Sequence, residues 1–326
     1  MAENRREMRD AFGATLIEIG ESYEQMVFLD ADLHTSTKAV MFKKRFPSRF
    51  YEIGIAEQNL FGIAAGMALE GFIPVPSTFA AFAARRALDQ LAISICFPEL
   101  NVKIPGSYVG IPTSRAGASH NCIEDIAVMR SIPNLKVADP VTAEDLRQIM
   151  LASMETPGPV YYRVSRYGVP ELFGAEHSFQ WGKGILLEKG SDVTLAGTGI
   201  MTHFCLEASH LLRRDGIHAD VLHLASIKPL DEHLLTDSVG KTGCIVTAEN
   251  ATVMGGFGDA VSRSLAASCP SPVSSIGVQD RFIESGGIDE LFARHQMRPE
   301  DIAAAARRVV SRRDDGGTSK RGDDKR

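Results

Sequence analysis

Short apolar runs alternate with helical patterns along most of this chain, and that alternation restricts the fold more than any other feature. In the first half, buried strands are predicted at residues 25–32, 100–104, 135–138 and 159–164. Apolar residues at helical spacing predict helices at residues 8–19, 56–69, 79–95, 123–130 and 143–154. Strands and helices that alternate in this way form a mainly parallel sheet with helices on both faces, so we predict an α/β fold.

The alternation stops once and then begins again. Residues 167–181 contain Gly, Pro and His in place of a periodic pattern, which is typical of a linker. A second series follows, with strands predicted at 192–196, 219–224, 244–248 and 273–278 and helices at 201–214, 258–267, 288–295 and 299–310. We therefore predict a first domain over residues 1–170, a linker over 171–190 and a second domain over 191–310.

Charge and cysteine content exclude several classes of protein. The net charge of −6 gives no reason to expect a nucleic-acid partner, and no apolar stretch reaches the ~18 residues of a membrane span. The five cysteines form no Cys-x-x-Cys pair, so no metal site is expected on this chain. The polar N-terminus has no signal-peptide core, which predicts a cytoplasmic protein. Residues 311–326 hold six basic, four acidic and no apolar side chains, and a disordered tail is predicted there.

An ordered set of motifs carries most of the functional information. The motifs are LDADL at 29–33, IGIAEQN at 53–59, STFAAF at 77–82, GASH…ED at 117–125, DP at 139–140 and SRYGVP at 165–170. In this order they resemble the C-terminal half of transketolases, and specifically the separate small subunit of split bacterial transketolases. The resemblance implies a pyrimidine-binding thiamine-diphosphate fold followed by a transketolase C-terminal α/β domain.

Glu57 stands where a helix begins after an extended segment, and a carboxylate there can simply favour the helix dipole. The resemblance implies more. In the family, the glutamate at this position hydrogen-bonds the aminopyrimidine of thiamine diphosphate and thereby promotes loss of the thiazolium C2 proton. Phe79 and Phe82 match aromatic positions around that ring, and Asp32 matches a residue that lines the cofactor pocket.

The same resemblance assigns residues to the substrate. Arg9, Ser36 and Arg166 fall on family positions that bind the terminal phosphate of a sugar, where charge-assisted hydrogen bonds are strong. His120, in GASH, matches a histidine that faces the reacting carbons of the substrate. A phosphorylated sugar is therefore the expected substrate class, and Glu57 and His120 are the expected catalytic residues.

The chain departs from ordinary transketolases at two places in this region. Tyr108 replaces a histidine that touches substrate, and Ser114-Arg115-Ala116 replaces Gly-Glu-Asp. The aspartate that Ala116 replaces recognises the 2-hydroxyl of the acceptor, and Arg115 brings a cation where the family has an anion. Losing a buried polar partner changes selectivity by ~1–3 kcal/mol. We therefore expect an acceptor unlike the standard aldose phosphates.

A Gly-Asp-Gly…Asn segment, which holds Mg²⁺ and the cofactor diphosphate in this family, is absent from the sequence. The resemblance therefore implies a separate N-terminal diphosphate-binding subunit, an assembly of two copies of each chain, and activity only in that complex. Thiamine diphosphate and Mg²⁺ would be held largely by the partner.

Two alternatives stay open at this point. One is a 2-oxo acid dehydrogenase-type subunit that passes an acyl unit to a lipoyl or carrier-protein thiol. The other is a non-catalytic scaffold subunit that keeps the fold. The phosphate residues and the GASH motif favour the transketolase reading. The acceptor, the donor and the pathway do not follow from the sequence.

Overall fold

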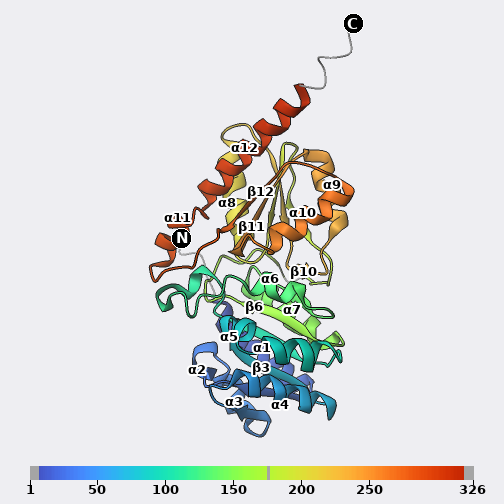
Figure 1. Ribbon diagram of the computed structural model, residues 1–326, viewed down its shortest axis with the longest axis vertical. Helices are drawn as coiled ribbons and strands as arrows, with labels where there is room; N and C mark the ends of the chain where they lie inside the picture. Colours follow the sequence, from blue (N-terminus) through green and yellow to red (C-terminus); the bar gives the residue numbers. More distant parts are fainter. Residues whose placement is uncertain (1–6, 175–176, 319–326) are drawn as a thin grey trace.

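A seven-stranded sheet forms the centre of the N-terminal half. The computed structural model describes residues 7–174 and 177–318, and shows two sheets that lie one above the other along the long axis (Figure 1). The first sheet has the order β10-β5-β6-β4-β3-β1-β2, and its strands are parallel except for β10, which pairs antiparallel with β5. The bounds are β1 Met26–Asp30, β2 Phe50–Glu52, β3 Ile73–Phe79, β4 Lys103–Ser107, β5 Lys136–Ala138, β6 Val160–Val164 and β10 Ser226–Lys228.

A five-stranded sheet organises the C-terminal half. Its order is β12-β11-β8-β9-β7, parallel except for the antiparallel pair of β7 and β9. The bounds are β7 Ile185–Glu188, β8 Val193–Gly197, β9 Ala219–His223, β11 Ile245–Thr252 and β12 Val273–Val278. Two mostly parallel sheets covered by helices confirm the predicted α/β fold.

Helices cover both faces of each sheet. In the first half they are α1 Met8–Ser22, α2 His34–Thr37, α3 Val40–Arg45, α4 Glu57–Leu69, α5 Ala80–Arg85, α6 Asp125–Ser131 and α7 Ala143–Glu155, with the short 3₁₀ helices η1 Pro47–Arg49 and η3 Ile111–Ala116 and the π-helix η2 Gln90–Cys96. In the second half they are α8 Met201–Arg213, α9 Glu232–Thr242, α10 Phe257–Ser268, α11 Ile288–Arg294 and α12 Pro299–Thr318. No helix of the described residues is long and apolar enough to cross a membrane.

Strand β1 shows how one sheet supplies two cores. Phe28 packs with α1, α3 and α7 on one face, while Val27 and Leu29 pack with α4, α5 and η2 on the other. Successive side chains of a strand point to opposite faces, so a strand buried on both sides reads as one continuous apolar run. This explains why β1 was predictable as a buried strand.

The predicted helix over residues 79–95 is wrong at its start and in its middle. Phe79 ends strand β3, α5 ends at Arg85, and η2 begins at Gln90. The backbone N–H of Ala87 bonds the carbonyl of Phe82, five residues earlier, so the helical turn widens at this point.

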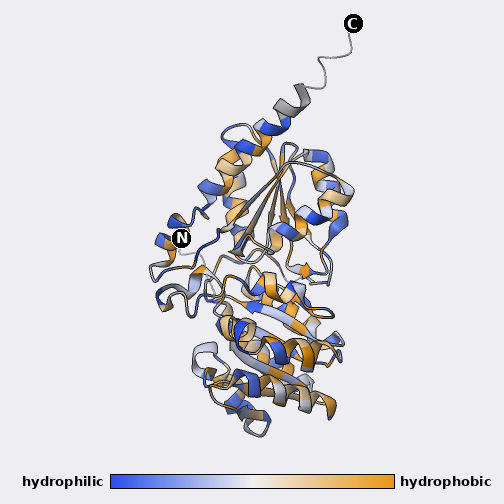
Figure 2. Ribbon diagram, in the orientation of Figure 1, coloured by the Kyte–Doolittle hydropathy of each residue, from blue (hydrophilic) through white to orange (hydrophobic). Residues whose placement is uncertain are grey.

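The C-terminal helix α12 runs to Thr318 and therefore continues past residue 310, where the sequence predicted a disordered tail to begin. Figure 2 shows hydrophobic and hydrophilic residues alternating along it, and its apolar side chains Ile302, Ala306 and Val309 are buried. This apolar stripe packs on α8, and the packing explains why the helix continues into a segment of charged residues. Residues 319–326 of the predicted tail lie outside the described part of the chain.

A buried ion network joins the two halves of the chain. Arg163 on β6 is 1% exposed; it donates to Asp125 at 2.8 Å and to Asp139 at 2.7 Å, and to the backbone carbonyl of Asn250 on β11 at 3.0 Å. Strand β10, from the second half, also completes the first sheet. Backbone pairing and a fully paired buried charge thus hold the second half against the edge of the first sheet.

Candidate active site

The predicted site residues gather where the parallel strands of the first sheet end. Asp32 follows β1, Glu57 follows β2, Phe79 ends β3, Tyr108 follows β4 and Arg166 follows β6. These five strands are neighbours in the order β6-β4-β3-β1-β2. Ligands of parallel α/β sheets bind at the carboxyl ends of the strands, because loops from several strands converge there. The sheet order therefore explains how residues far apart in sequence come to share one edge.

Glu57 is the first residue of α4 and is 4% exposed. Both of its carboxylate oxygens lie 3.3 Å from Nη1 of Arg86, and the hydroxyl of Thr78 lies 3.5 Å from Oε1. Arg86 itself is half exposed, and its guanidinium carbon lies 4.0 Å from the centre of the Phe82 ring. A buried carboxylate with a single half-exposed cation remains accessible from one side.

The accessible side of Glu57 faces a cavity of about 550 Å³. Its lining is formed by Ile55, Ala56, Glu57, Gln58, Asn59, Arg85 and Arg86, from the start of α4 and the end of α5. A carboxylate at the wall of a cavity can accept a hydrogen bond from a ligand that enters it.

An aromatic cluster stands beside this carboxylate. The rings of Phe79 and Phe82 stack with centres 5.8 Å apart, and the Tyr108 ring stacks on Phe79 at 4.2 Å. The His120 ring meets Phe82 edge-on at 5.3 Å and Phe79 at 6.1 Å. Phe79, Phe82, Tyr108 and His120 are thus brought together as one apolar and aromatic wall, the kind of surface that a planar ring stacks on.

Tyr108 links this wall to the predicted phosphate residues. Its hydroxyl donates to the Ser36 carbonyl at 3.5 Å, and the Arg166 guanidinium lies 5.3 Å from its ring centre. Burial lowers the pKa of Arg9, but Glu7 and the nearby Tyr108 hydroxyl raise it on balance. Arg9, Ser36 and Arg166 therefore surround one tyrosine, and two of them bring positive charge.

Two of these residues have unusual backbones. Asp32 has φ +60° and Tyr108 has φ +61°, in the left-handed region that side chains other than glycine seldom adopt. Residues held in this region cluster at ligand sites, where surrounding structure fixes them at a cost of ~1–3 kcal/mol each. Asp32 is exposed, and its backbone N–H donates to Glu52 at 2.9 Å.

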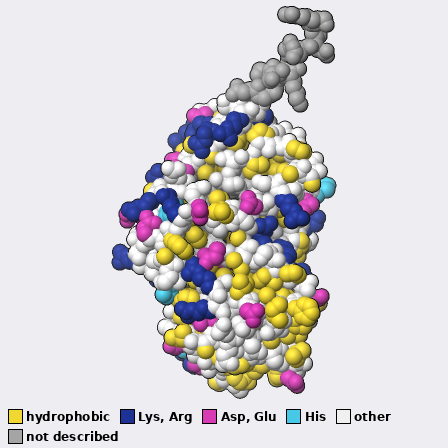
Figure 3. All heavy atoms as spheres, viewed as in Figure 1, with side chains coloured by type: hydrophobic (Ala, Val, Ile, Leu, Met, Phe, Trp, Pro, Cys, Tyr) yellow, Lys and Arg dark blue, Asp and Glu magenta, His cyan; other side chains and the backbone are white. Residues whose placement is uncertain are grey.

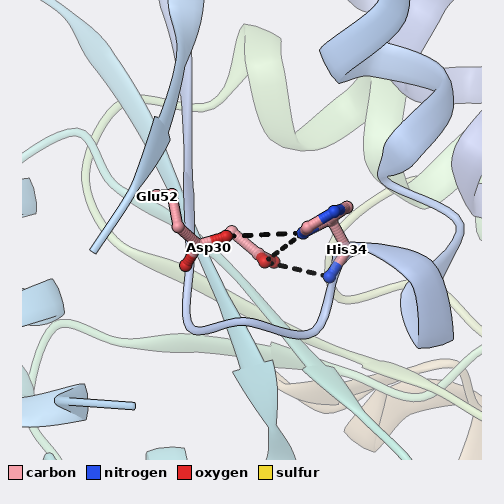
Figure 4. Close-up of side chains that lie close together, drawn as sticks. All are labelled: Asp30, His34 and Glu52. Atoms are coloured by element: carbon pink, nitrogen blue, oxygen red, sulfur yellow. Dashed lines mark hydrogen bonds and ion pairs between the residues drawn. The ribbon is translucent and has the colours of Figure 1, made fainter. Parts of the chain in front are cut away.

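A hydrogen-bonded cluster beneath this edge holds the Asp32 loop (Figure 4). Oδ2 of buried Asp30 accepts from the backbone N–H groups of Leu33 and His34 at 2.8 and 2.9 Å, and lies 3.0 Å from Nδ1 of His34. Glu52 lies 3.4 Å from the same ring nitrogen. Burial raises the pKa of Asp30, while the bonds from His34 and the backbone oppose that rise.

Asp30, His34 and Glu52 are also the one group of described residues whose ligand atoms lie close enough together to hold a metal ion. Their hydrogen bonds already use Oδ2 of Asp30 and Nδ1 of His34, and the Lys43 ammonium lies 3.4 Å from the other ring nitrogen. A cation beside the ring opposes a second one, so we interpret the group as a support for the loop between β1 and α2.

Among the described residues, no hydrogen bond, ion pair or ring contact joins Arg115 or Ala116 to the other predicted site residues. Both are exposed on η3, which packs against α11 of the second half. The Arg115 side chain makes no hydrogen bond or ion pair with the described residues. Ser114, one residue earlier, donates to the Gly286 carbonyl at 2.8 Å and has φ +62°. The structure thus holds this segment through Ser114 and leaves Arg115 facing outward, so a contact of Arg115 with substrate stays a prediction.

Two arginines of the site were missed by the sequence reasoning. Arg85 and Arg86 end α5, and they contact the loop of His120 and the carboxylate of Glu57, respectively. Their position three and four residues after the STFAAF motif was a usable signal. Their partners depend on tertiary structure, however, so residue type alone did not identify them.

Together these observations define the class: an α/β protein on two mostly parallel sheets, with a buried glutamate and an aromatic wall at the carboxyl edge of the first. The sequence matches the pyrimidine-binding domain of transketolase over residues 4–170 and the transketolase C-terminal domain over residues 182–302. The chain belongs to the transketolase family, whose members are thiamine diphosphate enzymes.

Relatives of similar length are separately encoded subunits. The chain is 39% identical to the 6-deoxy-6-sulfo-D-fructose transketolase subunit of Clostridium sp. (strain MSTE9), over 94% of this chain and 95% of that one. It is 34% identical to a subunit of the apulose-4-phosphate transketolase of Phocaeicola vulgatus, over 96% and 100%. A solved structure of a split-gene transketolase, an inactive β4 tetramer, matches with a TM-score of 0.88 at 44% identity, over 93% and 98%. The chain therefore matches these subunits over nearly their whole length.

Proposed function

We propose that this chain is the small subunit of a thiamine-diphosphate-dependent, transketolase-like transferase that moves a two-carbon ketol unit from a ketose phosphate to an acceptor. The observation that carries the proposal is the position of Glu57. It is a buried carboxylate at the wall of a cavity, beside an aromatic ring, at the carboxyl edge of a parallel sheet. Family membership supports the reaction class.

The residues at this edge fit the aminopyrimidine half of the cofactor. When bound, thiamine diphosphate supplies a thiazolium that accepts electrons while a carbon–carbon bond breaks. In this chain, Glu57 would accept a hydrogen bond from the aminopyrimidine, and Phe82 would stack on that ring once the half-exposed Arg86 guanidinium moves aside. Phe79 stacks on Phe82 and would support it against the bound ring. Asp32, at the end of the next strand, would line the same pocket.

Substrate recognition is assigned to the residues around Tyr108. Arg9, Ser36 and Arg166 would bind the terminal anionic group of the sugar, because two guanidinium groups there flank one tyrosine. His120 would face the reacting carbons from the aromatic wall. Relatives act on a sulfonated sugar and on apulose 4-phosphate, which supports an acceptor or donor outside the standard set. The changes at Tyr108, Arg115 and Ala116 point the same way.

A partner subunit is the second part of the proposal. No Gly-Asp-Gly segment occurs in the sequence, so a diphosphate-binding subunit would hold the diphosphate and Mg²⁺ in an assembly of two plus two. The surface that we name the α4–η2 face supports this. It consists of Ile55, Gly62, Gly66, Leu69, Ile93 and Phe97, all exposed. The space-filling view shows hydrophobic side chains gathered over this half of the molecule (Figure 3). A cytoplasmic location stays a prediction from the sequence.

Continuity with the cavity makes the α4–η2 face the best surface for that partner. Ile55 lines the cavity beside Glu57 and is 72% exposed, and Phe97 at the far end is 78% exposed. Nothing lies within 4 Å of where a side chain would begin at Gly62 or Gly66, so another chain can approach the helix backbone closely. Exposed apolar surface of this kind marks protein interfaces.

Reconstitution tests the proposal directly. The purified chain is mixed with a candidate diphosphate-binding subunit, one that contains the Gly-Asp-Gly…Asn segment, and with thiamine diphosphate and Mg²⁺. Two-carbon transfer is then assayed from xylulose 5-phosphate, fructose 6-phosphate and 6-deoxy-6-sulfofructose. We expect transfer only when both chains are present. Acyl transfer to a lipoyl group in the same mixture would support the 2-oxo acid dehydrogenase alternative and contradict the proposal.

A further inference from the structure

Arg85 at the end of α5 is bonded almost entirely to the loop that carries His120. Its Nε donates to Oε1 of Glu124, the residue directly before α6. Nη1 donates to the carbonyls of Ala118 and Ser119 at 3.3 and 3.4 Å, and Nη2 donates to the carbonyl of Asn121 at 3.3 Å. Every nitrogen of the guanidinium is therefore used inside this chain, around one loop of four residues.

Glu124 fixes the arginine in turn. Its other oxygen accepts from the backbone N–H of Ile123 at 3.0 Å. The hydrogen bond to Glu124 raises the pKa of Arg85. The same bond lowers the pKa of Glu124, although burial of that carboxylate opposes the change. The pair stays charged, so the planar fork of the arginine keeps a fixed direction toward the loop carbonyls.

Among the described residues, few other hydrogen bonds hold the carbonyl side of this loop. Ala118 and Ser119 are exposed, Gly117 has φ +74°, and the bonds within the loop run from the N–H groups of His120 and Asn121 to the Gly117 carbonyl. The His120 ring makes T-shaped contacts with Phe79 and Phe82, and its Nδ1 lies 2.8 Å from the Ser119 hydroxyl. A half-exposed imidazole on a short loop turns easily unless the loop carbonyls are fixed.

We propose that Arg85 is a positioning residue, which holds the His120 loop so that the imidazole stays against Phe82 at the mouth of the site. The inference rests on the proposed function, in which His120 faces the reacting carbons. A lysine could keep the charge of Arg85 but not its fork of three donors toward Glu124 and the carbonyls. Small displacements of a reacting group are costly, since about 1 Å of misplacement can lower a rate on the order of 10²-fold.

A double-mutant cycle between Arg85 and His120 tests this inference in the complex reconstituted with its diphosphate-binding subunit. The variants are Arg85→Ala, Arg85→Lys, His120→Ala and Arg85→Ala with His120→Ala, and the donor is hydroxypyruvate, the smallest ketol donor. Arg213→Ala is the matched control, because Arg213 also pairs with a glutamate but lies on α8 in the second half. Thiamine diphosphate affinity and unfolding temperature are measured for each complex.

If Arg85 acts through His120, Arg85→Ala lowers kcat roughly tenfold or more with KM within about twofold, and Arg85→Lys restores part of kcat. In the His120→Ala background the same change then costs less than about twofold. Equal losses in both backgrounds, or a raised KM with unchanged kcat, would overturn the positioning role. Full activity of His120→Ala would instead contradict the proposed site itself, and the inference with it. Arg85→Lys decides the matter if Arg85→Ala does not fold.

Discussion

Two features of the site are set by individual side chains, a buried carboxylate and a strained tyrosine. Glu57 is held by Arg86 in the free chain, and that guanidinium also covers Phe82. Tyr108, at φ +61°, directs its ring against Phe79 and its hydroxyl toward Ser36 and Arg9. Holding a tyrosine at this backbone angle costs free energy. Residues held in this way cluster at ligand sites, so the angle favours a binding role for Tyr108.

Tyr108→Phe tests the substrate role of that hydroxyl. The change keeps the stacking on Phe79 and the contact with Arg166 but removes the group near Arg9. For a phosphorylated donor we expect KM to rise roughly two- to tenfold with kcat little changed, which corresponds to ~1 kcal/mol for one hydrogen bond. Steady-state kinetics with hydroxypyruvate, which has no phosphate, is the control and should be unaffected. Equal losses for both donors would argue against a phosphate site around Tyr108.

Most of the residues that the sequence motifs predicted for the site lie together in the structure, and the reason is geometric. Glu57 begins α4, Phe79 and Phe82 lie on either side of the junction between β3 and α5, and Tyr108 and His120 lie in loops, so their motifs fix their local placement. Arg85 and Arg86 point in different directions because they stand side by side at the end of a helix. Which carboxylate or carbonyl each one meets depends on α4 and α6, and no local pattern carries that information.

At the scale of elements, the clearest failure of sequence reasoning is strand β3. Its sequence, IPVPSTF, contains two prolines, which argue against a central strand because proline lacks a backbone N–H. The structure accommodates them because pairing with β4 covers only Thr78 and Phe79, beyond both prolines. On the other side β3 pairs with β1 over its first five residues. The strands β2 and β10 have only three residues each, too few for a periodic pattern to show.

Helix α10 offers a test of how its start is held. Glu249 on β11 is fully buried and accepts from the N–H groups of Phe257 and Gly258 at 2.7 and 2.8 Å. Burial raises the pKa of this carboxyl to about 7, although those two bonds oppose the rise. The folded chain therefore binds a proton more tightly than the unfolded one. The Glu249 carboxyl therefore contributes its full stabilisation below the ordinary pKa of a glutamate, and this contribution is lost as the pH rises through about 7.

Glu249→Gln should remove this dependence, because the amide stays neutral at every pH. The free energy of unfolding of the wild-type chain, relative to Glu249→Gln, is expected to fall between pH 5 and pH 8. The expected fall is on the order of 1 kcal/mol for each unit of difference in pKa. Urea unfolding at several pH values measures it, with Glu232→Gln on exposed α9 as the control. A constant difference across this range would show that the Glu249 carboxyl does not titrate there.

At the scale of the whole molecule, the proposed partner subunit would cover the α4–η2 face. Ile93, on η2, is 61% exposed within the α4–η2 face. Ile93→Glu would bury a charge in an apolar contact, which costs several kcal/mol unless it is paired. We expect this change to reduce association with the diphosphate-binding subunit at least tenfold in analytical ultracentrifugation, while the free chain stays folded. His233→Glu, at an 83% exposed side chain on α9, is the control. Unchanged association would place the partner elsewhere.

The central claim is that Glu57 activates a cofactor whose other end is held by a different chain. Exchange of the thiazolium C2 proton for deuterium in bound thiamine diphosphate, followed by NMR after acid quenching, measures that step without any substrate. In the reconstituted complex, Glu57→Gln is expected to slow exchange about 10²- to 10⁴-fold while thiamine diphosphate still binds. Exchange at the wild-type rate in the cofactor-bound Glu57→Gln complex would contradict the account.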